Sequence, residues 1–267
     1  LLPLLIFAGI VGFTGAFISL FLSKWMAKFS HNIKLFDYNN ISSLSSKEKL
    51  VFDIVEKISS NNNIKMPEVG IYESPEPNAF ATGATKNSSL VAVSTGLLDL
   101  MTEDEIEGVI SHEMAHILNG DMITMTLIQG VINSFVIFLS RIIASVVDNY
   151  LKSNDENASS GPSWVYYVVS IVLEIIFGIL ASLLVMWFSR HREFKADLGG
   201  AQYSSKQKMI SALKKLQLYS DKMLTDDTDK LATMKIGSKK RGGFFALFSS
   251  HPDLGDRIRA LEESNVY

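Results

Sequence analysis

The 267-residue chain contains no cysteine. A disulfide framework and a thiolate metal site are therefore excluded, and any zinc ion has to be bound by His, Asp or Glu side chains. The formal net charge is only −3, from 25 basic and 28 acidic side chains. Because this balance provides no basic field for a polyanion, we expect no nucleic-acid partner.

Three long segments are almost free of charge. Residues 1–22 contain no charged side chain, residues 122–147 contain only Arg141, and residues 164–188 contain only Glu174. Each segment is long enough to cross about 30 Å of hydrocarbon as a helix. The sequence therefore predicts an integral membrane protein with three transmembrane helices in the lipid bilayer. For residues 122–147, a buried helix of a soluble core is the alternative.

The charges that flank these segments predict their orientation. Basic residues follow the first and third segments, whereas the linker 148–163 is mainly acidic. The positive-inside rule then places residues 23–121 and 189–267 in the cytoplasm and the linker outside, in the periplasm. Residue 1 lies outside in this arrangement, without an initiator methionine or a signal peptide. We therefore expect that residues 1–22 form the second span of the native protein and that the first span is missing.

Arg141 and Glu174 lie inside predicted spans, where charges are costly and usually face a partner. The two spans are antiparallel, and at about 1.5 Å per residue the two side chains lie within about one turn of equal depth. We expect an ion pair that locks the hairpin. Alternatively, Arg141 extends toward the outer surface and Glu174 is protonated.

The sequence His-Glu-Met-Ala-His places His112 and His116 four residues apart, with Glu113 beside the first. On an α-helix, positions four apart lie on the same face, so both imidazoles can reach one Zn²⁺. Glu113 then lies where it can accept a proton from a zinc-bound water. Thr102 and Glu105 fit a capping box at the start of this helix. A buried amphipathic helix whose histidines only form hydrogen bonds is the alternative.

A catalytic zinc site needs a third protein ligand and an open coordination position. Met122 stands where the extended form of the motif has a third histidine, so that form is absent. Glu193 and Asp197 follow the third apolar segment and are four residues apart, hence on one helical face. One of them can bind the metal while the other orients a ligating histidine. The alternative is an ordinary solvated helix start.

Two short β-branched runs, at residues 68–72 and 89–93, predict strands of one small sheet. Between them lie residues 77–83. An exposed strand edge beside a zinc site can bind an extended peptide as an added strand. A hairpin without any such role fits the spacing equally well.

Amphipathic helices are expected at residues 43–60 and 204–219. Residues 221–250 contain basic, glycine-rich and aromatic stretches. This segment predicts either a loop that contacts the inner leaflet or an ordinary flexible loop. Together with the predicted strands and spans, these elements indicate a mainly helical α+β protein.

The sequence resembles the HtpX family of bacterial membrane metalloproteases, relatives of the CAAX prenyl proteases, over nearly its whole length. The resemblance is carried by residues 78–83, 90–98, 112–116, 119–122, 189–197 and 251–252.

This resemblance implies a zincin-like (gluzincin) fold for the cytoplasmic domain and one Zn²⁺ per chain, bound by His112, His116 and Glu193. It implies that Glu113 is the general base and later the proton donor, and that Asp197 orients a ligand from behind. It also assigns substrate-binding or oxyanion roles to six further residues, namely Asn78, Ala79, Phe80, Ala81, His251 and Arg257.

The implied activity is zinc-dependent endoproteolysis of misfolded or damaged membrane proteins at the cytoplasmic face of the bacterial inner membrane. The implied role is membrane-protein quality control and stress response, with membrane-protein and unfolded polypeptide substrates. Assembly as a homo-oligomer or in a membrane-protease complex is left open.

Two other functions are weighed against this one. An intramembrane site-2-type zinc protease is disfavoured by the acidic start of the zinc helix and by the lack of an Asn-Pro-Asp-Gly segment in a later span. A non-proteolytic membrane scaffold or holdase with structural zinc is disfavoured because Glu113 is intact and only three ligands are available.

Overall fold

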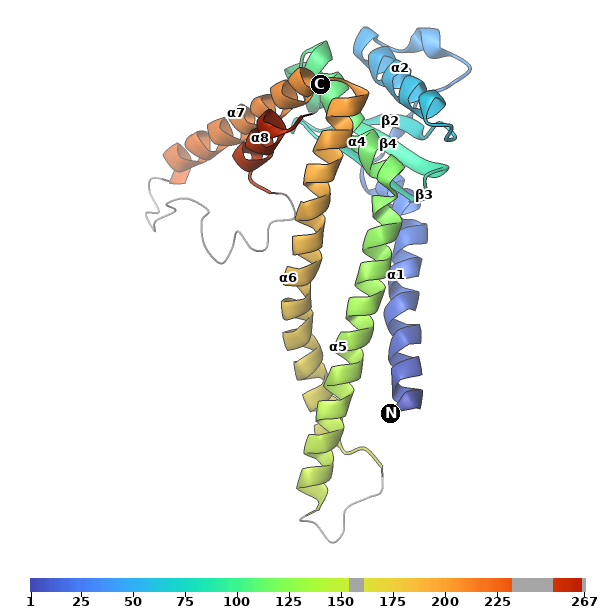
Figure 1. Cartoon of the computed structure of the whole chain (residues 1–267), viewed down its shortest axis with the longest axis vertical. Helices are drawn as coiled ribbons and strands as arrows, with labels where there is room; N and C mark the ends of the chain where they lie inside the picture. Colours follow the sequence, from blue (N-terminus) through green and yellow to red (C-terminus); the bar gives the residue numbers. More distant parts are fainter. Residues whose placement is uncertain (154–160, 232–251, 266–267) are drawn as a thin grey trace. The chain divides into compact units, whose positions relative to one another are not determined.

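The computed structural model describes residues 1–153, 161–231 and 252–265. Within these ranges the protein is mainly helical and has one small sheet, as the sequence predicts (Figure 1).

The chain divides into two compact units, each built from separate stretches of sequence. The first unit consists of residues 1–19 and 124–188, and the second of residues 20–123 and 189–267.

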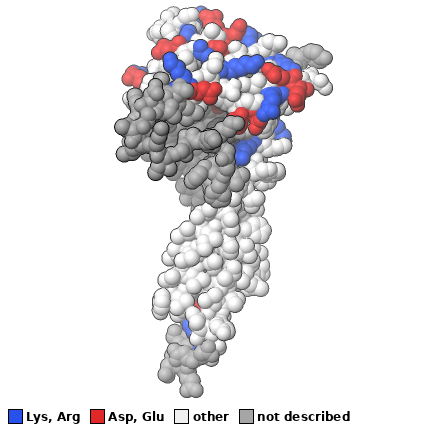
Figure 2. Space-filling view, turned by 90° about the vertical axis from the view of Figure 1, so that its left-hand side faces the viewer, with Lys and Arg blue, Asp and Glu red and all other residues white. Residues whose placement is uncertain are grey.

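Three long helices contain the predicted spans: α1 (Leu2–Ser30), α5 (Asp121–Lys152) and α6 (Trp164–Tyr203). Each has a window that is long and apolar enough to cross a membrane. Only 17% of that window is buried inside the protein in α5 and 6% in α6, which excludes buried helices of a soluble core. In the view of Figure 2, charged side chains cover the second unit, whereas the helices of the first unit show almost only uncharged residues.

The helices continue beyond the predicted ends of the spans. α1 runs on from residue 22 to Ser30, and α6 runs on from residue 188 to Tyr203. The residues that follow each span include Lys, Arg, Glu and Ala, which are good helix formers, and no proline interrupts them. Glu193 and Asp197 therefore lie on the same continuous helix as the third span.

Small residues bring α1 and α5 together in the first unit. A Cβ atom added to Gly12 would lie 2.6 Å from the backbone nitrogen of Ser134, so no larger residue fits there without a shift. Ala8 and Ala144 are fully buried. Close approach at small residues is the usual packing mode of helices in lipid, where dispersion contacts replace the hydrophobic effect.

The predicted pair between Arg141 and Glu174 is confirmed. An Nη2 atom of Arg141 lies 3.7 Å from Oε1 of Glu174. The same guanidinium donates to the Tyr166 hydroxyl at 3.5 Å and lies 5.3 Å from the centre of the Phe7 ring. Because Phe7 belongs to α1, the cluster connects all three helices of the first unit.

The second unit contains a four-stranded sheet of β1 (Lys34–Leu35), β2 (Glu68–Tyr72), β3 (Ala79–Thr85) and β4 (Ser88–Ser94). The strand order is β1-β2-β4-β3. β1 pairs with β2 and β3 with β4 in antiparallel fashion, whereas β2 and β4 are parallel, so β3 is an edge strand. β2 and β4 are the two predicted strands.

Further helices belong to this unit, and some of them pack on the sheet. They are a 3₁₀ turn (Ile41–Ser43), α2 (Ser46–Asn61), α3 (Thr95–Leu100), α4 (Glu103–Asn119), α7 (Lys206–Leu231) and α8 (Leu254–Glu263). The predicted loop at 221–250 is corrected for residues 221–231, which extend α7, while residues 232–250 lie outside the described residues.

Alternate valines of β2 and β4 put one face of the sheet into the main core. Val69, Val91 and Val93 are fully buried and belong to one apolar cluster with Ile106 and Ile110 of α4. Removal of this apolar surface from water fixes the rotation of α4 against the sheet. The rotation in turn decides where the histidine-bearing face of α4 points.

The ends of α4 are set by local sequence. Its start has the predicted capping box, in which the side chains of Thr102 and Glu105 bond each other's backbone N–H. Its end is Gly120, whose φ of 70° is left-handed and favours glycine. α5 starts directly afterwards, so Asp121 lies beside the last turn of α4.

A charge-exchange experiment tests the pair in the first unit. Arg141→Glu and Glu174→Arg should each lower the free energy of unfolding in detergent or bicelles by about 2–3 kcal/mol, because each leaves like charges together in an apolar helix bundle. The double exchange should recover at least half of that loss. A double variant no more stable than the weaker single variant would show that the two side chains do not stabilise each other.

Candidate metal centre

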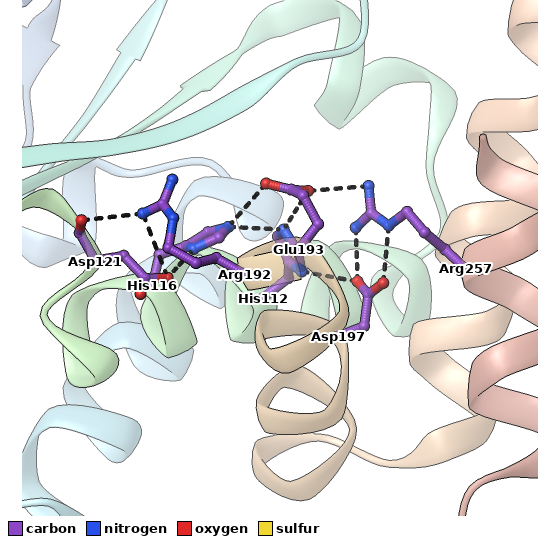
Figure 3. Close-up of polar contacts among 7 residues, drawn as sticks. All are labelled: His112, His116, Asp121, Arg192, Glu193, Asp197 and Arg257. Atoms are coloured by element: carbon purple, nitrogen blue, oxygen red, sulfur yellow. Dashed lines mark hydrogen bonds and ion pairs between the residues drawn. The ribbon is translucent and has the colours of Figure 1, made fainter. Parts of the chain in front are cut away.

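α4 presents His112, Glu113 and His116 on adjoining positions of one face. The Nε2 atoms of the two histidines lie 3.2 Å apart, with ring centres separated by 4.7 Å (Figure 3). His112 is buried, with 7% of its surface exposed. Two imidazoles that turn the same nitrogen toward one point are suited to a shared metal rather than to solvent.

Glu193 of α6 supplies a carboxylate to the same point. Its Oε1 lies 3.4 Å from Nε2 of His116, and its Oε2 lies 3.6 Å from Nε2 of His112. The carboxylate is buried, with 3% of the residue exposed. One ligand atom from each of the three residues lies within 4.8 Å of the others.

These separations fit a tetrahedral metal ion. Metal–ligand bonds of about 2.0–2.1 Å at the tetrahedral angle hold ligand atoms about 3.3 Å apart. The 3.2 Å between the two nitrogens agrees with that value. The carboxylate of Glu193 turns one oxygen toward each nitrogen, Oε1 at 3.4 Å from His116 and Oε2 at 3.6 Å from His112. Two histidines and one glutamate leave a fourth position open, as catalytic zinc sites require.

An aspartate and an arginine stand behind His112. Oδ1 of Asp197 lies 2.9 Å from Nδ1 of His112. Arg257 of α8 donates to both oxygens of Asp197, at 2.8 and 2.6 Å. Burial raises the pKa of Asp197, but the hydrogen bonds from Arg257 and His112 outweigh it and hold the pKa below its usual value. An ionised carboxylate this close to Nδ1 favours the tautomer with the proton on Nδ1, which leaves Nε2 to face the metal position.

A second aspartate and arginine stand behind His116. Oδ2 of Asp121 lies 2.5 Å from Nδ1 of His116, and Arg192 donates to the backbone carbonyl of Asp121 at 3.0 Å. Burial lowers the pKa of His116, but hydrogen bonds with Asp121 and Glu193 outweigh it and raise the pKa to about 10. Each metal-facing histidine is thus held by an Asp–Arg pair (Figure 3).

Comparison with known sequences identifies the family. Residues 45–265 match the family model of Peptidase family M48. The chain belongs to this family.

Curated relatives agree with the M48 assignment and confirm the resemblance to HtpX. The chain is 48% identical to Protease HtpX of Tolumonas auensis over 97% of its own length and 86% of that protein. It is 49% identical to the Protease HtpX homolog of Bacillus subtilis, over 98% of its own length and 85% of that protein.

A solved structure supports the fold. The crystal structure of S. mikatae Ste24p superimposes with a TM-score of 0.66 at 16% identity. The match covers 97% of this chain and 58% of the other. At this identity the likeness concerns architecture only.

The remaining predicted site residues have different surroundings in the structure. Arg257 is buried and lies 3.2 Å from Oε2 of Glu193 as well as against Asp197, so its guanidinium faces carboxylates. His251 lies outside the described residues. Asn78 precedes the edge strand β3 and lines a cavity of about 320 Å³ together with His112, Glu113 and Glu193.

Within β3 the neighbouring predicted residues mainly pack. Ala79 and Ala81 contact the main apolar cluster. The ring of Phe80 lies against those of His31 and Tyr72, with ring centres 5.2 and 5.8 Å away. A contribution of this strand to substrate binding therefore has to come mainly from its backbone.

Sequence reasoning missed Asp121 and Arg192. Asp121 was part of a family motif, but no role followed from its position, because a residue five places after His116 leaves the metal-facing side of a continuous helix. The helix break at Gly120 brings it back. Arg192 directly precedes Glu193 in the sequence. Its contact with Asp121, which lies 71 positions away, becomes visible only in the structure.

Asp121→Asn tests the pair behind His116. The substitution keeps the shape but removes the charge, so we expect zinc affinity to fall by about 10- to 100-fold. Competition with a coloured chelator measures the affinity, and the thermal midpoint reports on the fold. Asp53→Asn on the exposed face of α2 is the matched control and should change neither quantity. Unchanged affinity in the Asp121 variant would show that this carboxylate does not orient a ligand.

Proposed function

We propose that this protein is a zinc-dependent endopeptidase of the bacterial inner membrane that cleaves misfolded or damaged membrane proteins and unfolded polypeptides at the cytoplasmic face. The observation that carries the proposal is the convergence of His112, His116 and Glu193, with Glu113 in the cavity that His112 and Glu193 also line. Membership of an M48 family whose relatives are named Protease HtpX supports it.

The chemistry follows from this arrangement. When bound, Zn²⁺ lowers the pKa of a coordinated water toward about 7 and polarises the scissile carbonyl. Glu113 follows His112 in α4 and lines the cavity, where its carboxylate can accept the water proton and return it to the leaving amine. His112, His116 and Glu193 hold the metal, and the aspartates behind the histidines keep the imidazoles oriented.

Substrate binding is assigned to the edge strand β3. Its inner side pairs with β4, so the backbone groups on its outer side are free of the sheet ladder. An extended polypeptide can add there as a further strand and gain main-chain hydrogen bonds irrespective of its sequence. Such recognition suits unfolded chains, because a folded substrate cannot offer an extended strand.

The cytoplasmic orientation is supported by charge. Basic residues follow the first and third apolar segments, whereas the linker between the second and third is mainly acidic. All metal-facing residues belong to the second unit, and α4 begins with Glu103, Asp104 and Glu105. This acidic start favours an aqueous location over one inside the hydrocarbon, as an intramembrane zinc protease would require.

A purely structural zinc site is the second candidate, and the ligand set speaks against it. Structural sites are closed by four protein ligands. Among the described residues, the group that can bind one metal ion has three members, and Glu113 adjoins it. An open position beside a carboxylate is an arrangement for hydrolysis.

Glu113→Gln separates catalysis from metal binding. We expect the rate of casein digestion to fall by about 10²–10⁴-fold, because the amide cannot accept the water proton, while zinc content stays at one ion per chain. Glu56→Gln on the exposed face of α2 is the control and should retain full activity. Full digestion by the Glu113 variant, or by wild-type protein stripped of zinc, would contradict this mechanism.

A further inference from the structure

A group of polar side chains lies between two membrane helices of the first unit. On α6, Tyr166, Ser170 and Glu174 are four residues apart and therefore share one face. Arg141 of α5 contacts both Tyr166 and Glu174. Ser140 directly precedes Arg141 and is fully buried, and Ser170 is buried as well. Hydroxyl, guanidinium and carboxylate groups thus occur together inside segments that are otherwise apolar.

The polar atoms of this group are incompletely satisfied. Among the described residues, Oγ of Ser140, Oγ of Ser170 and Nε of Arg141 are buried and have no hydrogen-bond partner. The ion pair is loose, because 3.7 Å separates Nη2 of Arg141 from Oε1 of Glu174, whereas a charge-assisted hydrogen bond spans about 2.7–2.9 Å. Hydrocarbon supplies no hydrogen bonds, so these groups are suited to bind a further polar group.

The two charged members of the group reach the surface of the first unit. The side chains of Arg141 and Glu174 are 29% and 33% exposed. Their neighbours along the two helices, Leu139, Ile171 and Ile175, are exposed and apolar. In the view of Figure 2 the helices of this unit show almost only uncharged residues. Arg141 and Glu174 therefore form a polar spot in an apolar surface that another helix in the bilayer can contact.

The polar spot lies near the middle of the membrane. Trp164 begins α6, and an exposed tryptophan at the end of a span is typical of the membrane interface. Glu174 follows ten residues later, which corresponds to a distance of about 15 Å at about 1.5 Å per residue. Because the hydrocarbon core is about 30 Å thick, a partner has to present its polar group near half depth. Lipid head groups lie at the surface, so another membrane span is the partner that fits.

The chemistry of the polar spot defines the side chain that this span carries. Arg141 offers guanidinium donors, and Glu174 offers a carboxylate acceptor. A carboxamide complements both, since its oxygen can accept from Arg141 while its NH₂ group donates to Glu174. Folded membrane proteins turn such residues toward their own interior, whereas a misfolded or unassembled one exposes them to lipid.

A second copy of the chain would also offer charges to the polar spot. One polar contact between membrane helices changes an association constant by only about 3- to 15-fold. This contribution is too small to hold a permanent dimer, but it suffices to favour one class of span over another in transient binding. In addition, the pairing of Arg141 with Glu174 already compensates both charges within one chain.

We propose that Arg141 and Glu174 form an intramembrane docking site for substrate spans that expose a polar side chain to lipid near half depth, with asparagine and glutamine as the best match. This inference rests on the proposed proteolytic function and adds a substrate class to it. A span that docks there keeps the unfolded part of the same substrate at a high effective concentration for the protein that carries the metal centre.

Three single-span reporters test the proposal with the full-length protein in proteoliposomes. All carry the same unfolded, casein-derived tail at both ends, and the middle of the span has either asparagine or leucine. We expect kcat/KM for tail cleavage to be about 3- to 15-fold higher for the asparagine reporter, mainly through a lower KM. The third reporter, with asparagine two helical turns nearer one end of the span, should behave like the leucine reporter. Equal cleavage of the two mid-span reporters would overturn the proposal.

The double variant Arg141→Met/Glu174→Leu removes the polar spot. Both residues change together, because replacement of a whole ion pair by apolar residues is often neutral, whereas removal of one partner is strongly destabilising. The variant should cleave the asparagine and leucine reporters equally, while one zinc per chain and an unchanged thermal midpoint show that it is folded. Leu139→Met/Ile175→Leu, at exposed positions of the same two helices, is the matched control and should keep the preference. A preference that persists in the Arg141/Glu174 variant would refute the docking site.

The outcomes also distinguish this proposal from the proposed function. If the wild-type protein cleaves neither soluble casein nor any reporter, the protease assignment fails and the docking site fails with it. If it digests casein but does not distinguish the reporters, only the docking site fails. A dimer that dissociates in the Arg141/Glu174 variant, together with equal cleavage of the reporters, would assign the polar spot to a second copy and overturn the proposal.

Discussion

The bond between each metal-facing histidine and an aspartate is the interaction on which the site depends. His112 and His116 carry the metal-binding nitrogens, but a free imidazole can rotate and can place its proton on either nitrogen. Asp197 and Asp121 remove that freedom, since a carboxylate at Nδ1 holds the proton there and points Nε2 at the metal position. Arg257 donates to the carboxylate of Asp197, and Arg192 lies 3.8 Å from that of Asp121, so both cations reduce the cost of burying these charges.

This requirement explains why distant parts of the sequence have to meet. α4 brings the histidines and the general base, the continuation of α6 brings Glu193 with Asp197, and α8 brings the arginine behind Asp197. α4 is fixed by its apolar face on the sheet, which also offers the edge strand β3. The helix α6 contains both an apolar stretch and the ligand Glu193, and α5 begins with Asp121.

Much of this could be read from the sequence, because the relevant signals are local. The His-Glu-Met-Ala-His motif, the Thr102–Glu105 capping box and the charge-free segments each lie within one element, and each predicts it by spacing. The contact between Arg141 and Glu174 was predicted from the similar depth of the two side chains in their antiparallel spans. The role of Asp121 could not be predicted, because its position depends on the left-handed conformation of Gly120. The close packing of α7 on α4 at Gly108 could not be predicted either, because it joins residues far apart in the sequence. The helical extension of residues 221–231 was missed because its polar composition is equally common in loops.

The central claim is that one Zn²⁺ is held by His112, His116 and Glu193. Anomalous X-ray scattering from crystals of the zinc-loaded protein, measured on both sides of the zinc absorption edge, tests it most directly. The account predicts a single peak per chain, about 2.0–2.2 Å from Nε2 of both histidines and from a carboxylate oxygen of Glu193. A peak bound by Asp197 in place of Glu193, or a peak away from these histidines, would contradict it.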